Sequence, residues 1–213
     1  MINSSWETPQ IDDIKGYLDI LHITHMWGIS AGFKYAINSL NKYSMRSAYK
    51  IHLVCRYGIP EWIAVPVRVL LRLPLKDLTE DDYNHLGYDV FSKLALGKEN
   101  IQAMRRKLAF FAPYPNTDDA PHCSNPERCK KAWYRAWGLD LFRLIHHPSD
   151  HLSFCDVIFT LRNMKDSNMH PECRNFVIDW VEESCPGLQK EEHVIRQVVA
   201  SIQDHARIHM IVD

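Results

Sequence analysis

The sequence has few glycines, no long apolar run and no excess of charge of either sign. Only 8 of its 213 residues are glycine, too few for a glycine-rich nucleotide-binding loop or a turn-dense β fold. The most apolar stretch, residues 63–71, is interrupted by Pro66 and Arg68 and is far shorter than the ~20 residues of a membrane span. Lys and Arg total 25 against 26 for Asp and Glu, so the clustered positive charge that drives nucleic-acid binding is missing. We therefore expect neither nucleic-acid nor membrane binding.

Recognised motifs for secretion and for catalysis are also missing. The first residues lack the charged segment and apolar segment of a secretory signal, which predicts an intracellular protein, with cytoplasm and nucleus not distinguished. The six cysteines are then expected to be reduced thiols and not a disulfide framework. There is no phosphate-binding loop, dinucleotide fingerprint or Gly-x-Ser-x-Gly elbow. The sequence thus predicts no cofactor and no catalytic residue.

Apolar residues recur at steps of three and four almost throughout, which predicts an all-α fold. The longest series predicts one helix from about residue 81 to 112, weakened at Gly97. The tail, residues 208–212, is the main candidate for a strand. Shorter helices are expected around residues 17–27, 33–40, 48–55, 62–71, 124–147, 154–161, 171–185 and 194–202.

An internal repeat organises the first part of the chain. Residues 22–29 align with residues 52–59, and in both copies an aromatic residue is followed by Gly and Ile. A glycine that adopts the left-handed conformation after the last helical turn explains this pattern. We therefore predict tandem helical hairpins in residues 1–75, followed in residues 76–213 by a long helix and a C-terminal helical bundle.

A histidine cluster offers an alternative function. His146, His147 and His151 lie close to Asp150, and such ligands occur in metal-dependent hydrolases. Pro148 lies within this run, which indicates a loop and not the inner face of a helix. We therefore interpret these histidines as surface or capping residues, and keep the hydrolase as the alternative hypothesis.

Cysteines and histidines near residues 122–129 and 170–173 could form a closed zinc site, because four soft ligands suffice. However, no Cys-x-x-Cys pair is present, and Cys173 also fits the apolar stripe of its own helix. The sequence therefore favours buried thiols without zinc. If a metal were bound, its candidate ligands would be His122, Cys123, Cys129 and Cys173.

Spaced aromatic and apolar positions over residues 14–205 resemble a known family. The first hairpins carry Trp27-Gly28, then Cys55-Arg56-Tyr57-Gly58-Ile59-Pro60-Glu61-Trp62, and the later part has Cys123, Cys129, Trp133, Trp137, Met169, Cys173 and Trp180. This pattern resembles the helical region that follows the BTB/POZ core in fungal BTB-domain proteins.

The resemblance implies a non-catalytic protein–protein interaction module. In that family the BTB/POZ core mediates association, and the helices after it extend the module. The core would precede Ile14, so the expectation is a truncated member that lacks it, without the partners that the core recruits.

The first helix carries apolar residues off its inward stripe, namely Leu18, Ile23 and Met26. Without a preceding core these side chains would face water, and a contiguous apolar patch usually marks an interface. We predict that these three residues bind a protein partner or a second copy of the chain. Association entropy offsets much of the gain from burying them, so weak dimerisation is expected.

Overall fold

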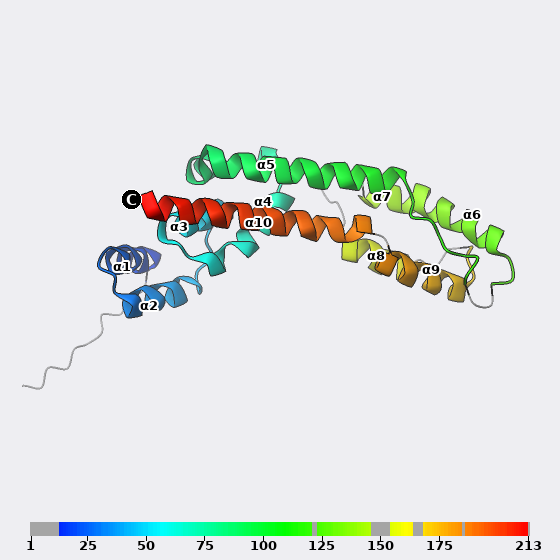
Figure 1. Ribbon diagram of the computed structural model, residues 1–213, viewed down its shortest axis with the longest axis horizontal. Helices are drawn as coiled ribbons and strands as arrows, with labels where there is room; N and C mark the ends of the chain where they lie inside the picture. The colour runs from blue at the N-terminus through cyan, green and yellow to red at the C-terminus, as the bar shows by residue number, and fades with distance from the viewer. Residues whose placement is uncertain (1–12, 121–122, 146–153, 164–167, 185, 213) are drawn as a thin grey trace, which may run out of the picture.

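The computed structural model describes residues 13–120, 123–145, 154–163, 168–184 and 186–212, and within these ranges it contains helices and no strand. The all-α prediction is therefore confirmed. None of the described helices is long and apolar enough to cross a membrane. Figure 1 shows an elongated arrangement, in which α1 and α2 lie at one end and α6 and α9 at the other.

The predicted tandem hairpins are present at the N-terminal end. They consist of α1 (Ile14–Met26), α2 (Ser30–Leu40), α3 (Ser47–Tyr57), a 3-10 turn η1 (Pro60–Trp62) and α4 (Ala64–Arg72). Gly28 and Gly58 follow α1 and α3 with φ of 64° and 63°, as the internal repeat predicts. The two hairpins meet where the ring of His25 lies 5.3 Å from that of Tyr57, whose hydroxyl also lies 3.4 Å from His22 Nδ1.

The long helix α5 (Glu80–Phe110) follows a short 3-10 turn, η2 (Leu75–Asp77). A capping box starts it: the Asp82 N–H donates to Thr79 Oγ1, and the Thr79 N–H donates to Asp82. The predicted weak point at Gly97 is wrong, because the helical geometry breaks at Gly87, with φ of 65°. Gly97 instead lies in regular helix and is buried.

The remaining helices are α6 (Pro126–Ala136), a π-helical turn η3 (Trp137–Leu141), α7 (Phe142–Ile145), α8 (Phe154–Asn163), α9 (Pro171–Ser184) and α10 (Pro186–Val212). The predicted strand at residues 208–212 is wrong, because these residues continue α10. The buried residues Val198, Ile202 and Ala206 recur at steps of four, which is the spacing of one helix face, and the helix continues from them into residues 208–212.

Buried apolar side chains form two separate cores. The first combines α1–α4 and the N-terminal part of α5 with Val194, Ile195, Val198 and Ile202 of α10. The second combines the C-terminal end of α5 with α6–α9. In Figure 1, α5 and α10 run side by side along the molecule. The last helix, α10, thus returns to the first core, and the division of the chain at residue 75 stays a prediction.

A largely buried ion pair also joins α5 to α10. The Arg105 guanidinium donates to Glu191 at 2.7 and 3.3 Å, and both side chains are largely buried. Arg105 belongs to the basic run Arg105-Arg106-Lys107, and from sequence such a run is expected on a solvated face. That expectation fails for Arg105, because the return of α10 covers it.

Candidate functional site

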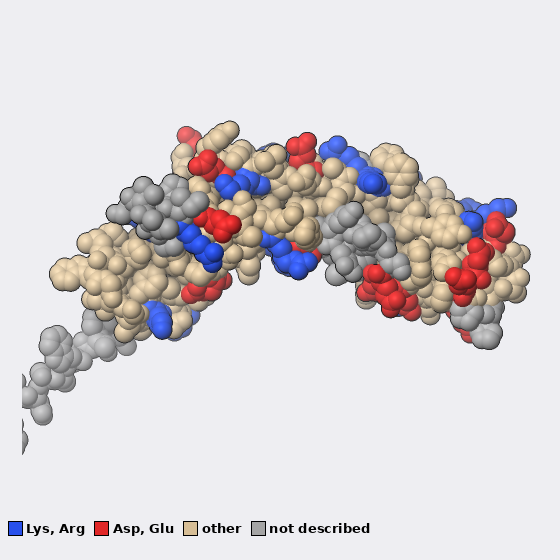
Figure 2. All heavy atoms as spheres, in the orientation of Figure 1, with Lys and Arg blue, Asp and Glu red and all other residues tan. Residues whose placement is uncertain are grey.

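An exposed apolar surface lies at the end of α1 and the turn after it. Ile23, Met26 and Trp27 are 52%, 64% and 74% exposed, and Ile29 is 47% exposed. We call these four residues the α1 apolar surface. Figure 2 shows the outer end of the α1–α2 hairpin as mostly uncharged on the face in view. The predicted Leu18 is not part of it, since its side chain is partly buried against the first core.

Local packing explains why these side chains remain outside. Leu21 and Thr24, on the opposite face of α1, are buried, and the Thr24 hydroxyl donates to the Ile20 carbonyl at 2.6 Å. The histidines His22 and His25 contact Tyr57 of α3. Because this face of α1 packs against the other helices of the hairpins, the opposite face is exposed to solvent.

The histidine cluster His146, His147 and His151 lies outside the described residues. Other histidines form aromatic contacts. The rings of His52 and His85 lie 5.6 Å apart and both pack near Tyr49. Burial lowers the pKa of His52, which favours the neutral form of its ring.

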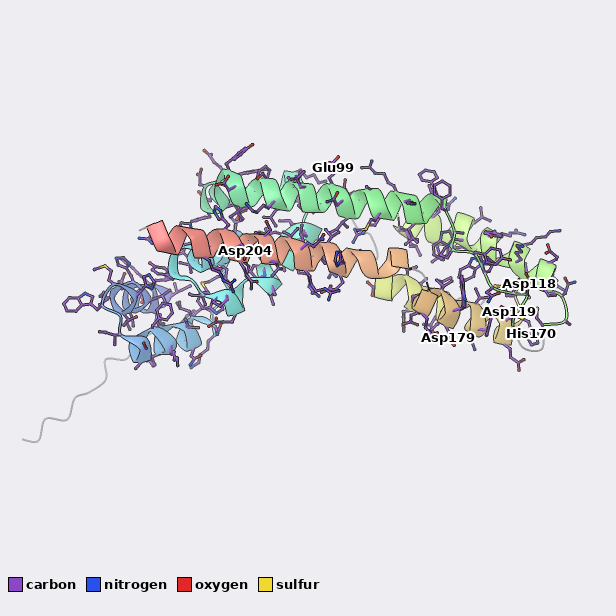
Figure 3. The ribbon with its side chains drawn as sticks, viewed as in Figure 1. Glu99, Asp118, Asp119, His170, Asp179 and Asp204 are labelled. Carbon is purple, nitrogen blue, oxygen red and sulfur yellow. The ribbon has the colours of Figure 1, made fainter. Side chains whose placement is uncertain are left out.

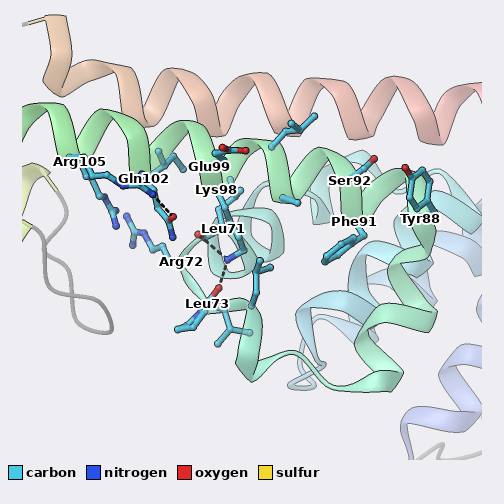
Figure 4. A pocket seen from close by; sticks show the side chains of 16 residues that line it. Leu71, Arg72, Leu73, Tyr88, Phe91, Ser92, Lys98, Glu99, Gln102 and Arg105 are labelled. Carbon is cyan, nitrogen blue, oxygen red and sulfur yellow. Dashed lines mark hydrogen bonds between the residues drawn. The ribbon is translucent and has the colours of Figure 1, made fainter.

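A groove of about 810 Å³ lies between the end of α4 and α5, and Figure 4 shows its lining. Lys98 reaches into it from α5 and donates to the carbonyls of Leu71, at 3.2 Å, and of Leu73. Lys98 thus satisfies carbonyls at the C-terminal end of α4, where a positive charge is favourable. The described residues that line the groove include one carboxylate, Glu99, and neither His nor Cys. In this groove the Lys98 ammonium is held by two backbone carbonyls.

Lys98 should make stability depend on pH. Burial lowers its pKa to about 8, against 10.5 for an ordinary lysine. The cost of burying the charged form is fully present below pH 8 and is relieved as pH rises toward 10.5, because the unfolded chain keeps the proton longer. Relative to Lys98→Met, the wild-type chain should gain about 1–3 kcal/mol of unfolding free energy over this interval. Urea unfolding of both proteins at several pH values measures this difference, and parallel pH profiles would contradict it.

At the other end of the molecule, Cys173 meets two cysteines that precede it by more than 40 residues. The sulfur atoms of Cys123, Cys129 and Cys173 lie within 4.8 Å of one another, and those of Cys123 and Cys129 are 3.8 Å apart. We call these residues the thiol cluster. Cys129 and Cys173 are buried and Cys123 is partly buried.

Two helix starts build the thiol cluster. Cys129 lies in the first turn of α6 and Cys173 in the first turn of α9, and a proline occupies the first helical position of both. The Asn125 side chain caps α6 by accepting from the Arg128 N–H at 3.0 Å. Cys123 is held in the preceding segment, where its N–H donates to the Ala120 carbonyl at 3.4 Å. Cys129 and Cys173 therefore both lie near the N-terminal, positive end of a helix.

The thiols affect one another's protonation. Burial raises the pKa of Cys173 to about 12, and hydrogen bonds with Cys123 and Cys129 add to this. For Cys123, burial acts upward, but hydrogen bonds from Cys173, Asn125 and Cys129 outweigh it and lower the pKa. The cluster is thus chemically asymmetric, and one thiol is more readily ionised than its neighbour.

Comparison with protein-family models, with curated proteins and with solved structures finds no match to this chain. The case for function therefore depends on its own residues.

The structure brings together three of the four residues considered as metal ligands from sequence. The fourth, His122, lies outside the described residues. His170, the residue just before α9, lies at the same end of the molecule as the segment that carries Asp118 and Asp119 (Figure 3). Spacing alone could not show this convergence, because it depends on α6 and α9 packing in the second core. The pattern His170-x-x-Cys173 was the feature of the sequence that pointed to α9 as a source of metal ligands.

Proposed function

We propose that this chain is a non-catalytic protein–protein interaction module that associates weakly with a second copy through the α1 apolar surface. The observation that carries this proposal is the group of four exposed apolar side chains, Ile23, Met26, Trp27 and Ile29. Large apolar residues gathered at one place on a surface typically mark a protein contact. Tryptophan and methionine are also enriched in the cores of interfaces.

Charge favours a second copy as the partner. The net charge of the chain is only -1, so two copies repel each other little. An isologous contact would stack the two surfaces on each other across a two-fold axis. Burying a large apolar side chain contributes about 1.5–3 kcal/mol, whereas association costs about 4–15 kcal/mol. The expected dimer is therefore weak and depends on concentration.

The resemblance to the helical region of fungal BTB/POZ proteins supports the same proposal. Those helices belong to association modules, and the tandem hairpins are among the segments that carry the likeness. An adaptor role follows if the same surface also accepts other helical proteins.

Sedimentation over a hundredfold concentration range tests self-association. We expect the mean mass of the wild-type chain to rise with concentration, and the variant Ile23→Asp with Met26→Asp to remain monomeric. Both side chains are exposed, so the variant should keep the wild-type helix content and unfolding midpoint.

Val65→Asp with Val69→Asp is the matched control. These valines are also exposed, on α4, and they receive the same added charge away from the α1 apolar surface. The control should dimerise like the wild type. A strictly monomeric wild-type chain, or equal loss of association in both variants, would refute the proposed surface. Turnover of phosphate esters by the purified protein would refute the non-catalytic role.

A further inference from the structure

The thiol cluster has no role in the proposed interaction and lies at the opposite end of the molecule. It joins three separate segments: the irregular stretch between α5 and α6, the start of α6 and the start of α9. The stretch after α5 carries no regular helix or strand among its described residues. A bond that links these three segments would therefore stabilise this end of the second core.

We propose that Cys123, Cys129 and Cys173 bind one Zn²⁺ ion as thiolates, with His170 as the fourth ligand. This reverses the expectation of buried thiols without zinc that the sequence favours. The site is a closed structural centre of the Cys3His type, because protein ligands fill every tetrahedral position.

The spacing of the sulfurs fits zinc. Zn–S bonds of about 2.3 Å in tetrahedral geometry place two sulfurs about 3.8 Å apart. The sulfurs of Cys123 and Cys129 already have this separation, and all three lie within 4.8 Å of one another. Because no pair of these sulfurs is more than 4.8 Å apart, the Cys173 sulfur needs to approach the other two by at most about 1 Å to complete the three-sulfur face.

His170 is placed to supply the fourth ligand. It directly precedes Pro171, the first residue of α9, and stands three residues before Cys173, a spacing at which a side chain at a helix start can reach back to the first turn. Its carbonyl accepts from the Arg174 N–H at 2.9 Å, which fixes its backbone to the first turn of α9. The His170 side chain is exposed and does not belong to the group of three sulfurs, so its ring must turn inward to bind the ion.

Zinc also compensates the negative charge that the cluster gains when its thiols lose their protons. On binding, each of the three thiols loses its proton to solvent and forms a Zn–S bond, with no change in oxidation state. A buried thiolate needs a positive partner, and the divalent ion supplies it. A disulfide is a poorer solution, because it joins only two of the three sulfurs and requires an oxidant.

The full-length protein, purified under reducing conditions without metal-affinity tags, should contain about one zinc ion per chain by elemental analysis. Replacement of zinc by Co²⁺ should give the thiolate charge-transfer and visible bands of a tetrahedral centre. Cys129→Ser or Cys173→Ser should weaken zinc binding by more than the about 10- to 100-fold that is lost when a group hydrogen-bonded to a metal ligand is removed. His170→Ala should weaken it by at least about tenfold.

Two matched variants serve as controls. Cys55→Ser removes a thiol of the first core and His122→Ala a histidine next to Cys123, and both should keep stoichiometric zinc. If the thiol variants fold poorly, chelation of the wild-type protein keeps the proposal testable: alkylation of the three cluster cysteines should be fast without zinc and slow with it. The zinc site is refuted if reduced wild-type protein binds neither Zn²⁺ nor Co²⁺, or if it holds iron instead. Loss of zinc from His122→Ala but not from His170→Ala would refute the fourth ligand.

Discussion

Replacing Trp137 with alanine is expected to lower the free energy of unfolding by roughly 3–5 kcal/mol, the usual cost of truncating a buried aromatic residue. Trp137 is 1% exposed, and its ring lies 5.5 Å from that of Trp133 in the second core. Its Nε1–H donates to the Leu108 carbonyl at 3.0 Å. Leu108 lies in the last turn of α5, where carbonyls have no partner within the helix. The substitution therefore opens a cavity and leaves a helix end unsatisfied.

Two further variants separate these contributions. Trp137→Phe keeps most of the apolar volume but loses the hydrogen bond, and should cost about 1–3 kcal/mol. Trp27→Ala removes an exposed tryptophan and should change stability by no more than about 0.5 kcal/mol. Urea unfolding followed by circular dichroism measures all three. Similar losses for Trp27→Ala and Trp137→Ala would contradict this account of the second core.

Gly97→Ala is expected to destabilise the protein by about 1–2 kcal/mol, although alanine is the better helix former. A β-carbon at Gly97 would lie 2.6 Å from Val198 Cγ2 and 3.0 Å from Leu71 Cδ2. Val198 is a β-branched residue in α10 with one strongly preferred side-chain rotamer, so relieving the contact costs either a poor rotamer or a shift of the helix. Overpacking at the junction of α4, α5 and α10 therefore outweighs the gain in helix propensity.

Val198→Ala should restore space for the added methyl group, so the double variant should be more stable than the sum of the two single changes predicts. Gly138→Ala is the matched control, because a β-carbon there meets no atom within 4 Å. Its stability should be unchanged or raised by up to about 1 kcal/mol. Thermal unfolding of the four variants provides the measurement. Stabilisation by Gly97→Ala would show that α5 and α10 do not approach closely.

Apolar spacing predicted the long helices well because a helix repeats the same signal over many turns. The expected helix at residues 81–112 agrees closely with α5 (Glu80–Phe110). The break at Gly87 was missed because a glycine within a helical pattern has more than one explanation. It can interrupt the helix, as Gly87 does with its φ of 65°, or it can allow another helix to approach closely, as Gly97 does.

The π-helical turn was missed although its signal was present. Trp133, Trp137, Leu141 and Ile145 are all buried, and they follow one another at steps of four. Three such steps exceed the 3.6 residues of an α-helical turn, so a straight helix would rotate the last residue away from the core. The wider turn η3 takes up this excess and keeps all four residues inside.

The candidate sites were predictable to different degrees. The exposure of Ile23 and Met26 could be predicted because the apolar stripe of α1 indicates which positions face away from the core. Leu18 could not, because its burial depends on neighbouring helices. The thiol cluster joins residues 123, 129 and 173, and no spacing rule shows that α6 and α9 begin side by side.

The return of α10 to the first core has a consequence for biosynthesis. The first core needs residues up to Ile101 and then Val194, Ile195, Val198 and Ile202 from the last helix. At about 5–20 residues per second, the roughly 90 residues in between take about 5–20 s to translate. During that interval the α10-facing sides of α3, α4 and α5 lack their cover, including the space beside Gly97. The second core lies wholly within the intervening segment, so on the ribosome it can be completed before the first.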